Sequence, residues 1–341
     1  MKKIVLASLF LIMTSCGVKL STTSNTKDEI VIKYLNTINA EDLKTDLTFI
    51  ASDKTEGRET GSEGQKIAGK YIINVYKKLG INYPKGATNY YQNVPAIFMN
   101  RFDNENLPDS ENIWAFIEGS EKPEEILIIS AHYDHIGIDK NGKICNGADD
   151  DGSGTSALLE IAQAFQMAKK EGHGPKRSIL FLHVTGEEHG LFGSQYYSEN
   201  PLFPIKNTIS DINIDMIGRR DNLHPNTSNY IYIIGSNYLS TDLFNITENA
   251  NNCYTKLDFD YKFNDKKDPN KYYYRSDHYN FAKNGIPSVF LFNGVHDDYH
   301  KESDEVSKIE FDALAKRTQL AFAMAWELAN RDKRPVVDKK G

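Results

Sequence analysis

The sequence predicts an α/β fold, in which a mostly parallel or mixed, twisted central sheet carries helices on both faces of a single domain. Short apolar runs rich in β-branched and aromatic residues alternate with segments of helical periodicity, and this alternation is typical of such sheets. A chain of 341 residues, 40% hydrophobic and 26% charged, suits one large globular unit. The runs that we expect to form strands are residues 126–130, 178–185, 209–215, 230–235 and 288–292.

Helical periodicity predicts four helices around this sheet. Two further segments, 86–110 and 251–275, are rich in Tyr, Asn and Asp, and we expect them to be surface insertions. The folded domain is expected to cover residues 28–335. The predicted helices lie at residues 30–38, 65–79 (closed by Gly80), 155–170 and 311–328.

The N-terminus predicts export and a lipid anchor. Two lysines precede an apolar stretch, residues 4–13, which is too short to span a bilayer and is typical of a signal peptide. Small residues before Cys16 and a glycine after it resemble a bacterial lipobox, so we expect cleavage before Cys16 and lipidation of its thiol. An ordinary secretory signal is the alternative. Residues 1–16 would then be the signal peptide and 17–27 a flexible tether, with the protein lipid-anchored in the bacterial cell envelope, in the periplasm or at the outer membrane.

The net charge bears on which binding partners to expect, and the cysteine content bears on a possible disulfide. The net charge is −7, and no Lys/Arg-rich run is present that could follow a phosphate backbone, so nucleic acid is not an expected partner. Beyond Cys16 the chain carries Cys145 and Cys253. An oxidising compartment permits a disulfide between them, but one distant pair does not establish it, and the pairing stays open.

The first motif that carries chemistry is SAHYDHIG, directly after the run at 126–130. A histidine that binds a metal usually donates its other ring N–H to a carboxylate, which fixes the tautomer. Asp134 is placed to orient His132 in this way, and His135 is a competing ligand. A polar strand end with incidental histidines is the plain alternative.

The second motif, NGADDDGSGT, places Asp149, Asp150 and Asp151 side by side before the helix at 155–170. Adjacent carboxylates raise each other's pKa unless a cation neutralises them, and a helix N-terminus favours negative charge. An exposed acidic turn is an alternative, whereas the spacing of a calcium-binding loop is absent.

The third motif, VTGEEHGLFGS, follows the run at 178–185 and contains Glu187 and Glu188. One of two adjacent carboxylates can bind a metal while the other takes a proton from water. Glycines around the pair permit close approach of the backbone. A surface pair of glutamates is the alternative.

Two further motifs complete the set. INIDMIG ends an apolar run with Asp215, which is costly to bury unless it is paired or bound to a metal, although it could also cap the next turn. DDYHKESDEVSKI places His300 after the last predicted strand, with His296 and His278 as rival ligands. Ligand sites of open α/β sheets gather beyond the carboxyl ends of the strands. We therefore expect one shared site for five residues: His132, Glu187, Glu188, Asp215 and His300.

The ordered series HYD, ADDDGSGT, GEEHGLFGS, NIDMIG, SDHYNF and YHKESD resembles the family-28 zinc metallopeptidases, the group of secreted bacterial di-zinc aminopeptidases. The resemblance runs from about residue 45, including DLTFIASDKTEGRETGSEGQKIA, to about residue 330. It implies a single-domain zinc-exopeptidase fold that removes residues from the N-termini of peptides or proteins. It also implies two Zn²⁺ ions as cofactors.

The resemblance implies a role for each matching residue. His132 and Asp215 would bind one zinc, Glu188 and His300 would bind the other, and Asp150 would bridge both. Glu187 would be the general base, and Asp134 would orient His132. The sequence departs from the family pattern in one place, because acidic residues flank Asp150 on both sides.

Three rival functions remain open. Glutaminyl cyclases share the scaffold with one zinc, and a carboxypeptidase or an aminoacylase would need a basic group for the substrate carboxylate, which Arg219, Arg220 or Arg275 could supply. A binding lipoprotein with a decayed site is the third. The aromatic run Tyr272, Tyr273 and Tyr274 could line a specificity pocket or simply pack on the surface.

Overall fold

A computed structural model describes residues 28–101 and 106–340. The predicted signal peptide (1–16), the lipidated Cys16 and the tether (17–27) lie outside the described residues. Within the described part, none of the helices is both long and apolar enough to cross a bilayer. Both described cysteines, Cys145 and Cys253, are free thiols and do not form the disulfide that the sequence left open.

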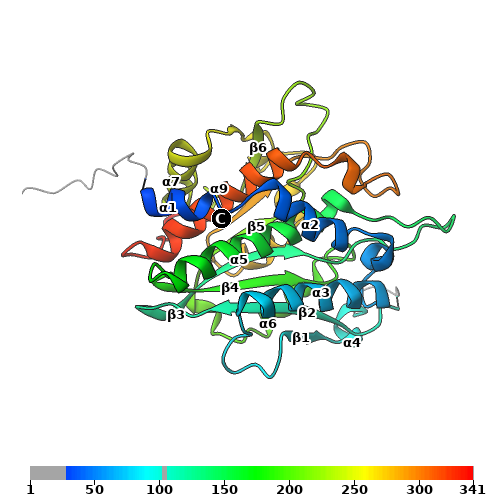
Figure 1. The fold of residues 1–341 in the computed structure, drawn as a ribbon, viewed down its shortest axis with the longest axis horizontal. Helices are drawn as coiled ribbons and strands as arrows, with labels where there is room; N and C mark the ends of the chain where they lie inside the picture. The colour runs from blue at the N-terminus through cyan, green and yellow to red at the C-terminus, as the bar shows by residue number, and fades with distance from the viewer. Residues whose placement is uncertain (1–27, 102–105, 341) are drawn as a thin grey trace, which may run out of the picture.

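At the centre, the described residues form one twisted sheet of eight strands in the order β1-β2-β4-β3-β5-β8-β6-β7 (Figure 1). The four central strands, β4, β3, β5 and β8, are mutually parallel, whereas β2 and β6 pair with them in the antiparallel sense. This is the mixed sheet that the sequence predicted. The strands are β1 Tyr91–Val94, β2 Ser110–Ile117, β3 Lys122–His132, β4 Arg177–Val184, β5 Thr208–Ile214, β6 Tyr230–Ile234, β7 Asp258–Asp260 and β8 Ser288–Phe292.

The expectation for segments 86–110 and 251–275 needs correction. Each was predicted as a surface insertion, but the first contributes β1, which pairs with β2, and the second contributes β7, which pairs with β6. Both strands are short and lie at the edges of the sheet. An edge strand is only partly buried, so it lacks the continuous apolar run that marks a central strand.

Helices cover both faces of the sheet, and all four predicted helices are present. The second of them ends as expected, because Gly80 adopts a left-handed conformation (φ 76°) that ends α3. In the part of the chain that the structure describes, five further helices are present that were not predicted. The helices are α1 Glu29–Leu35, α2 Ala40–Ile50, α3 Glu63–Leu79, α4 Ala96–Met99, α5 Gly154–Lys170, α6 Phe192–Glu199, α7 Thr241–Ala250, α8 His278–Ala282 and α9 Phe311–Asn330.

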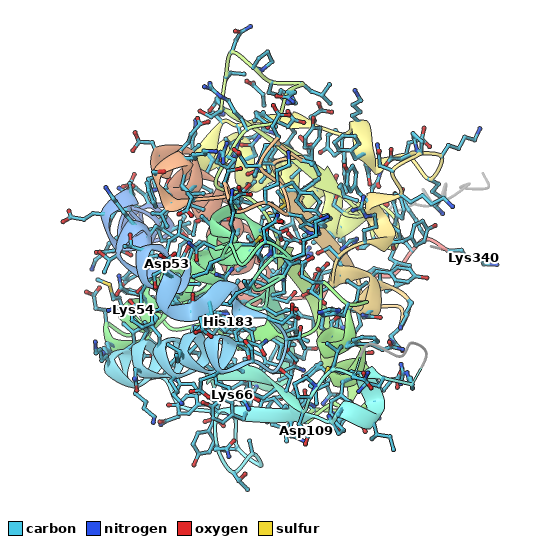
Figure 2. All side chains as sticks on the ribbon, turned by 90° about the vertical axis from the view of Figure 1, so that its right-hand side faces the viewer. Asp53, Lys54, Lys66, Asp109, His183 and Lys340 are labelled. Atoms are coloured by element: carbon cyan, nitrogen blue, oxygen red, sulfur yellow. The ribbon has the colours of Figure 1, made fainter. Side chains whose placement is uncertain are left out.

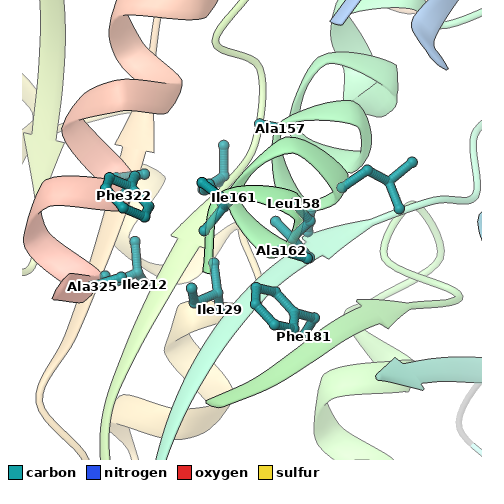
Figure 3. Packing of buried hydrophobic residues seen from close by; sticks show 14 of the residues in the cluster. Ile129, Ala157, Leu158, Ile161, Ala162, Phe181, Ile212, Phe322 and Ala325 are labelled. Atoms are coloured by element: carbon teal, nitrogen blue, oxygen red, sulfur yellow. The ribbon is translucent and has the colours of Figure 1, made fainter. Parts of the chain in front are cut away.

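The alternation of side chains along β3 divides the core into two layers. Leu127 and Ile129 belong to the larger apolar cluster, in which α5 and α9 pack on one face of the sheet (Figure 3). Ile126 and Ile128 point to the other face, where residues of α6 and α8 cover them. Because successive side chains of a strand face opposite ways, a strand covered on both faces must be apolar throughout. The run at 126–130 was recognisable for that reason.

One buried carboxylate in this core predicts a pH-dependent stability. Glu160 on α5 is 3% exposed, and its Oε2 atom has no hydrogen-bond partner among the described residues. Burial, together with the negative charges of Asp42 and Asp46, raises the pKa of Glu160 from 4.5 to about 8. The folded state therefore retains a proton that the unfolded state releases, so this contribution to stability is lost as the pH rises from 4.5 to about 8.

Replacing Glu160 by Gln removes that titration. The variant's free energy of unfolding, relative to that of the wild type, should increase by roughly 2–4 kcal/mol between pH 5 and pH 9. Urea denaturation at both pH values measures this difference. A difference that does not change with pH would contradict the prediction.

Candidate active site

The ends of three parallel strands bring the predicted residues to one edge of the sheet. His132 is the last residue of β3 and is paired in register with Val184, the last residue of β4. Glu187 and Glu188 follow β4, and Asp215 follows β5 directly. These polar side chains therefore meet where the buried strands stop.

The first group of side chains surrounds the Nε2 atom of His132. This atom lies 3.2 Å from Asp150 Oδ1, 3.6 Å from Asp215 Oδ1 and 3.9 Å from Glu187 Oε2. The imidazole is buried, and its Nε2 atom has no hydrogen-bond partner among the described residues. An orphaned ring nitrogen that faces three carboxylates is the arrangement expected around a cation.

The second group lies on the other side of Asp150. The Nε2 atom of His300 is 2.9 Å from Glu188 Oε2 and 3.2 Å from Asp150 Oδ2. His135, the competing ligand of the first motif, also reaches this group, since its Nδ1 atom is 2.7 Å from Glu188 Oε1 and 3.7 Å from Asp150 Oδ2. Asp150 is thus shared, with one oxygen facing each group.

The two neighbours of Asp150 point elsewhere. The carboxylate of Asp149 accepts a backbone hydrogen bond from Gly218 (2.6 Å), and its Oδ2 atom lies 3.1 Å from His296 Nε2. The Oδ1 atom of Asp151 accepts backbone hydrogen bonds from Gly154 and Met216, although Asp151 still lies close enough to His132 and Asp215 to share a cation with them. Of the three aspartates, only Asp150 reaches both histidine groups.

The carboxylate of Asp134 lies within ion-pair distance of His132, but its hydrogen bonds go to other groups. Its Oδ1 atom is 3.7 Å from His132 Nδ1, while the backbone oxygen of Asp134 is nearer, at 3.1 Å. The carboxylate instead accepts hydrogen bonds from the Thr60 hydroxyl (2.9 Å) and the backbone N–H of Glu187 (3.3 Å). The backbone oxygen of Asp134 therefore orients His132, and the carboxylate of Asp134 orients the loop that carries Glu187.

Two residues that the sequence reasoning missed hold the Asp150 loop. The carboxylate of Asp304 accepts hydrogen bonds from the backbone N–H groups of Asp149 (3.0 Å) and Asp150 (3.2 Å). The buried guanidinium of Arg58 donates to the backbone oxygens of Tyr133 and Gly147, both at 2.9 Å. Arg58 thereby ties the His132 loop to the Asp150 loop. The GR pair of the upstream segment TEGRETG was the available signal.

Two other histidines are core residues. Burial lowers the pKa of His183 and of His278 to about 3, so both imidazoles are neutral. His183 contacts the hydroxyl of Tyr76 inside the molecule, whereas residues such as Lys340 lie at its periphery (Figure 2). His278, a rival ligand in the sequence, stacks on the ring of Phe290 instead. His296, the other rival, supports Asp149.

Burial also sets the electrostatics of Glu187. It raises the pKa of this carboxyl well above the ordinary value, and the nearby carboxylates of Asp215 and Glu188 raise it further, while His132 opposes them. So many carboxylates in one buried place need positive charge. The donor set fits zinc, because imidazole nitrogens and carboxylate oxygens are the ligands of catalytic zinc sites. Two groups, His132 with Asp151 and Asp215, and His135 with Asp150 and Glu188, have ligand atoms within 4.8 Å of one another.

Comparison with known proteins decides the family. Residues 112–325, which include every candidate ligand named above, match the sequence model of Peptidase family M28. The chain belongs to this family. The match excludes the reading of the five motifs as unrelated polar strand ends.

The chain is also similar to individual curated proteins and, in its fold, to solved structures. A probable leucine aminopeptidase of Arthroderma benhamiae is 29% identical over 230 residues, covering 64% of this chain and 57% of the relative. The structure of BSAP, a zinc aminopeptidase from Bacillus subtilis, superposes with a TM-score of 0.63 at 15% identity, over 89% of this chain and 99% of that one. The glutaminyl cyclase of Bacteroides thetaiotaomicron superposes with a TM-score of 0.64 at 18% identity, over 85% and 98% of the two chains.

This chain spans only a little over half the length of the curated leucine aminopeptidase. At such low identities the two structural matches show the fold alone, and that fold carries both an aminopeptidase and a glutaminyl cyclase. The side chains of this site therefore distinguish between the two reactions.

Proposed function

We propose that this chain is a zinc-dependent aminopeptidase that hydrolyses the N-terminal peptide bond of peptides or proteins. The observation that carries the proposal is the shared carboxylate: Asp150 faces His132 with one oxygen and His300 with the other, at 3.2 Å in each case. One bridging carboxylate between two histidine–carboxylate groups is a ligand set for two cations. Glu187 lies beside the first group and is not needed as a ligand, so its carboxylate can act as the general base.

Each zinc would have its own ligands. His132 and Asp215 would hold one ion, Glu188 and His300 the other, with Asp150 between them. We assign His300 rather than His135 to the second ion because its Nε2 atom is close to both Glu188 and Asp150, while His135 approaches Glu188 alone within 3.2 Å. His135 then orients Glu188 by a hydrogen bond.

The chemistry divides between the ions and the protein. When bound, two zinc ions would polarise the scissile carbonyl and lower the pKa of a water molecule, so that this water could lose a proton at neutral pH and attack the carbonyl carbon. Glu187 takes the proton of that water on its carboxylate and returns it to the nitrogen of the leaving amine. The hydrogen bond from the backbone N–H of Glu187 to Asp134 holds the loop that carries the Glu187 carboxylate.

An aminopeptidase fits this site better than a glutaminyl cyclase does. Both histidines of a two-ion site are present, whereas the cyclases keep one zinc. The excess of carboxylates around Asp150 and Asp215 also attracts the positively charged α-amine of a free N-terminus. A peptide with a blocked N-terminus lacks that charge.

A peptide panel tests the proposal. The purified protein with excess zinc should release the first residue of Leu-Ala-Ala-amide, leave acetyl-Leu-Ala-Ala-amide intact, and lose activity in a chelator. Conversion of Gln-Ala-Ala-amide to pyroglutamyl-Ala-Ala-amide, with release of ammonia and no release of an amino acid, would favour the cyclase instead. Release of the C-terminal residue of acetyl-Leu-Ala-Ala, whose terminal carboxylate is free, would favour a carboxypeptidase and contradict exopeptidase action at the N-terminus.

We further propose that the enzyme works outside the cytoplasm, anchored by a lipid at Cys16. The support is the sequence alone, in which a short apolar stretch precedes the lipobox-like Cys16. Metabolic labelling with palmitate, compared between the wild type and Cys16→Ser, tests it, and equal labelling of both would contradict it.

A further inference from the structure

A pocket beside the candidate site is lined by both acidic and basic side chains. Asp150, Glu187 and Asp215 line one part of it. Apolar and aromatic side chains form its wall, and one cation, Arg275, also lines it. The wall residues are Met216, Tyr272, Phe290, Phe292, Val295 and Tyr299.

Arg275 differs from the two other arginines that the sequence offered for binding a substrate carboxylate. Arg219 pairs with Asp298 at 2.9 Å, and Arg220 pairs with Glu310 at 3.2 Å. The side chain of Arg275 is exposed, and across residues 28–101 and 106–340 no carboxylate lies within 4.0 Å of its guanidinium. Of these three arginines, Arg275 alone keeps its charge available to a ligand.

The position of Arg275 is nevertheless well defined. Its guanidinium carbon lies 5.0 Å from the ring centroid of Tyr272, and its backbone N–H donates a hydrogen bond to the backbone oxygen of Tyr272 at 3.0 Å. The next residue, Ser276, donates its hydroxyl to Asp215 at 2.6 Å. Arg275 therefore contacts the pocket wall through Tyr272, and its neighbour Ser276 is fixed to a candidate zinc ligand. A cation stacked on an aromatic ring loses little freedom when it binds a carboxylate.

We propose that Arg275 binds a carboxylate of the substrate, so that peptides carrying a carboxylate next to the scissile bond are the preferred substrates. This proposal rests on the proposed aminopeptidase function and names its substrate class. Such a substrate has a charge pattern that complements the pocket: its α-amine faces Asp150, Glu187 and Asp215, its aliphatic part covers the apolar wall, and its carboxylate pairs with the guanidinium.

Two kinds of peptide offer this carboxylate. One is a peptide whose N-terminal residue is Glu or Asp, and the other is a dipeptide whose C-terminal carboxylate follows the scissile bond by one residue. Both present a planar anion that a guanidinium can bind through two parallel hydrogen bonds. Separate pairs of peptides distinguish these sources.

The first pair is Glu-Ala-Ala-amide and Gln-Ala-Ala-amide, which differ only in the side-chain carboxylate. The second pair is Leu-Ala and Leu-Ala-amide, which differ only in the terminal carboxylate. Wild type, Arg275→Gln and the control Arg220→Gln are compared by kcat and KM, each loaded with zinc. Binding of the same peptides to Glu187→Gln, with and without Arg275→Gln, is measured by calorimetry, so that affinity is obtained without turnover.

We expect the wild type to prefer the charged member of one pair by about tenfold in kcat/KM, mainly through KM, since a contact present before and during the reaction acts on binding. Arg275→Gln should lose this preference while retaining kcat/KM for the neutral member within about twofold, and Arg220→Gln should keep the preference. The preference should weaken at 0.5 M salt because the guanidinium is exposed. The pair that responds identifies the source of the carboxylate.

Failure of this inference differs from failure of the proposed function. Suppose that the neutral peptides are cleaved. If Arg275→Gln then discriminates within both pairs as the wild type does, or if the wild type discriminates within neither pair, the proposed role of Arg275 is wrong and the proposed aminopeptidase function is retained. If no peptide is cleaved, the aminopeptidase is wrong. The binding data then decide on Arg275, since equal affinities with and without Arg275→Gln overturn its role, and selective loss of the charged peptides upholds it.

Discussion

Replacing Glu187 by Gln is expected to lower kcat by about 10²–10⁴-fold while zinc binding stays near that of the wild type. The amide has almost the same shape as the carboxylate, but it cannot take the proton of the attacking water. Glu187 is also not among the side chains assigned to either ion. Steady-state hydrolysis of Leu-Ala-Ala-amide, combined with metal analysis of the same preparation, measures both quantities.

The adjacent residue supplies a matched control. Glu188→Gln changes the same chemical group one position away, but it removes a candidate ligand of the second ion, so we expect it to lose zinc as well as activity. If Glu187→Gln kept full activity, the assignment of the base would be wrong. If it lost zinc as Glu188→Gln does, Glu187 would be a ligand.

The second large effect is expected at the shared aspartate. Asp150→Asn should bind zinc far more weakly at both positions and lower kcat/KM by at least about 10³-fold, because an amide carries no charge to bridge two cations. Zinc should raise the melting temperature of the wild type by mass action and leave that of the variant almost unchanged. Metal titration followed by thermal unfolding measures these responses.

The metal-free proteins separate loss of binding from loss of folding. Asp150 lies in a group of buried carboxylates that repel one another, so the metal-free Asp150→Asn variant should be at least as stable as the metal-free wild type. Asp139→Asn serves as a control that keeps zinc binding, because the Asp139 carboxylate accepts hydrogen bonds from the backbone N–H groups of Asn141 and Lys143 and is not a candidate ligand. A variant that binds two zinc ions as tightly as the wild type would show that Asp150 is not the bridge.

The central strands were predictable because burial on both faces makes a strand apolar throughout. The run at 126–130 lies inside β3, which is buried from Ile126 to His132. The edge strand β7 (Asp258–Asp260) has no buried residue, so its DFD sequence is indistinguishable from a loop. β2 was missed although it is mostly buried, because its apolar residues follow a polar start, SEN.

The candidate ligands were predictable from the sequence, whereas the contacts that support them were not. Its ligands are short motifs that follow recognisable strands, so their meeting at one edge follows from a parallel arrangement. The contacts that support the ligands could not be predicted in this way. Arg58 donates to backbone oxygens 75 and 89 residues away along the chain, and Asp304 accepts a hydrogen bond from a backbone N–H 155 residues away. Such contacts depend on loop paths that periodicity does not encode. The preference of His132 Nδ1 for the backbone of Asp134, rather than its carboxylate, likewise depends on local loop geometry.

Anomalous X-ray diffraction at the zinc edge, from crystals of the protein grown with excess zinc, tests the central claim most directly. We predict two zinc peaks per chain, one contacting His132 and Asp215, the other contacting Glu188 and His300, with Asp150 touching both. A single peak, peaks that do not share Asp150, or zinc bound only elsewhere on the chain would contradict a two-zinc hydrolytic site.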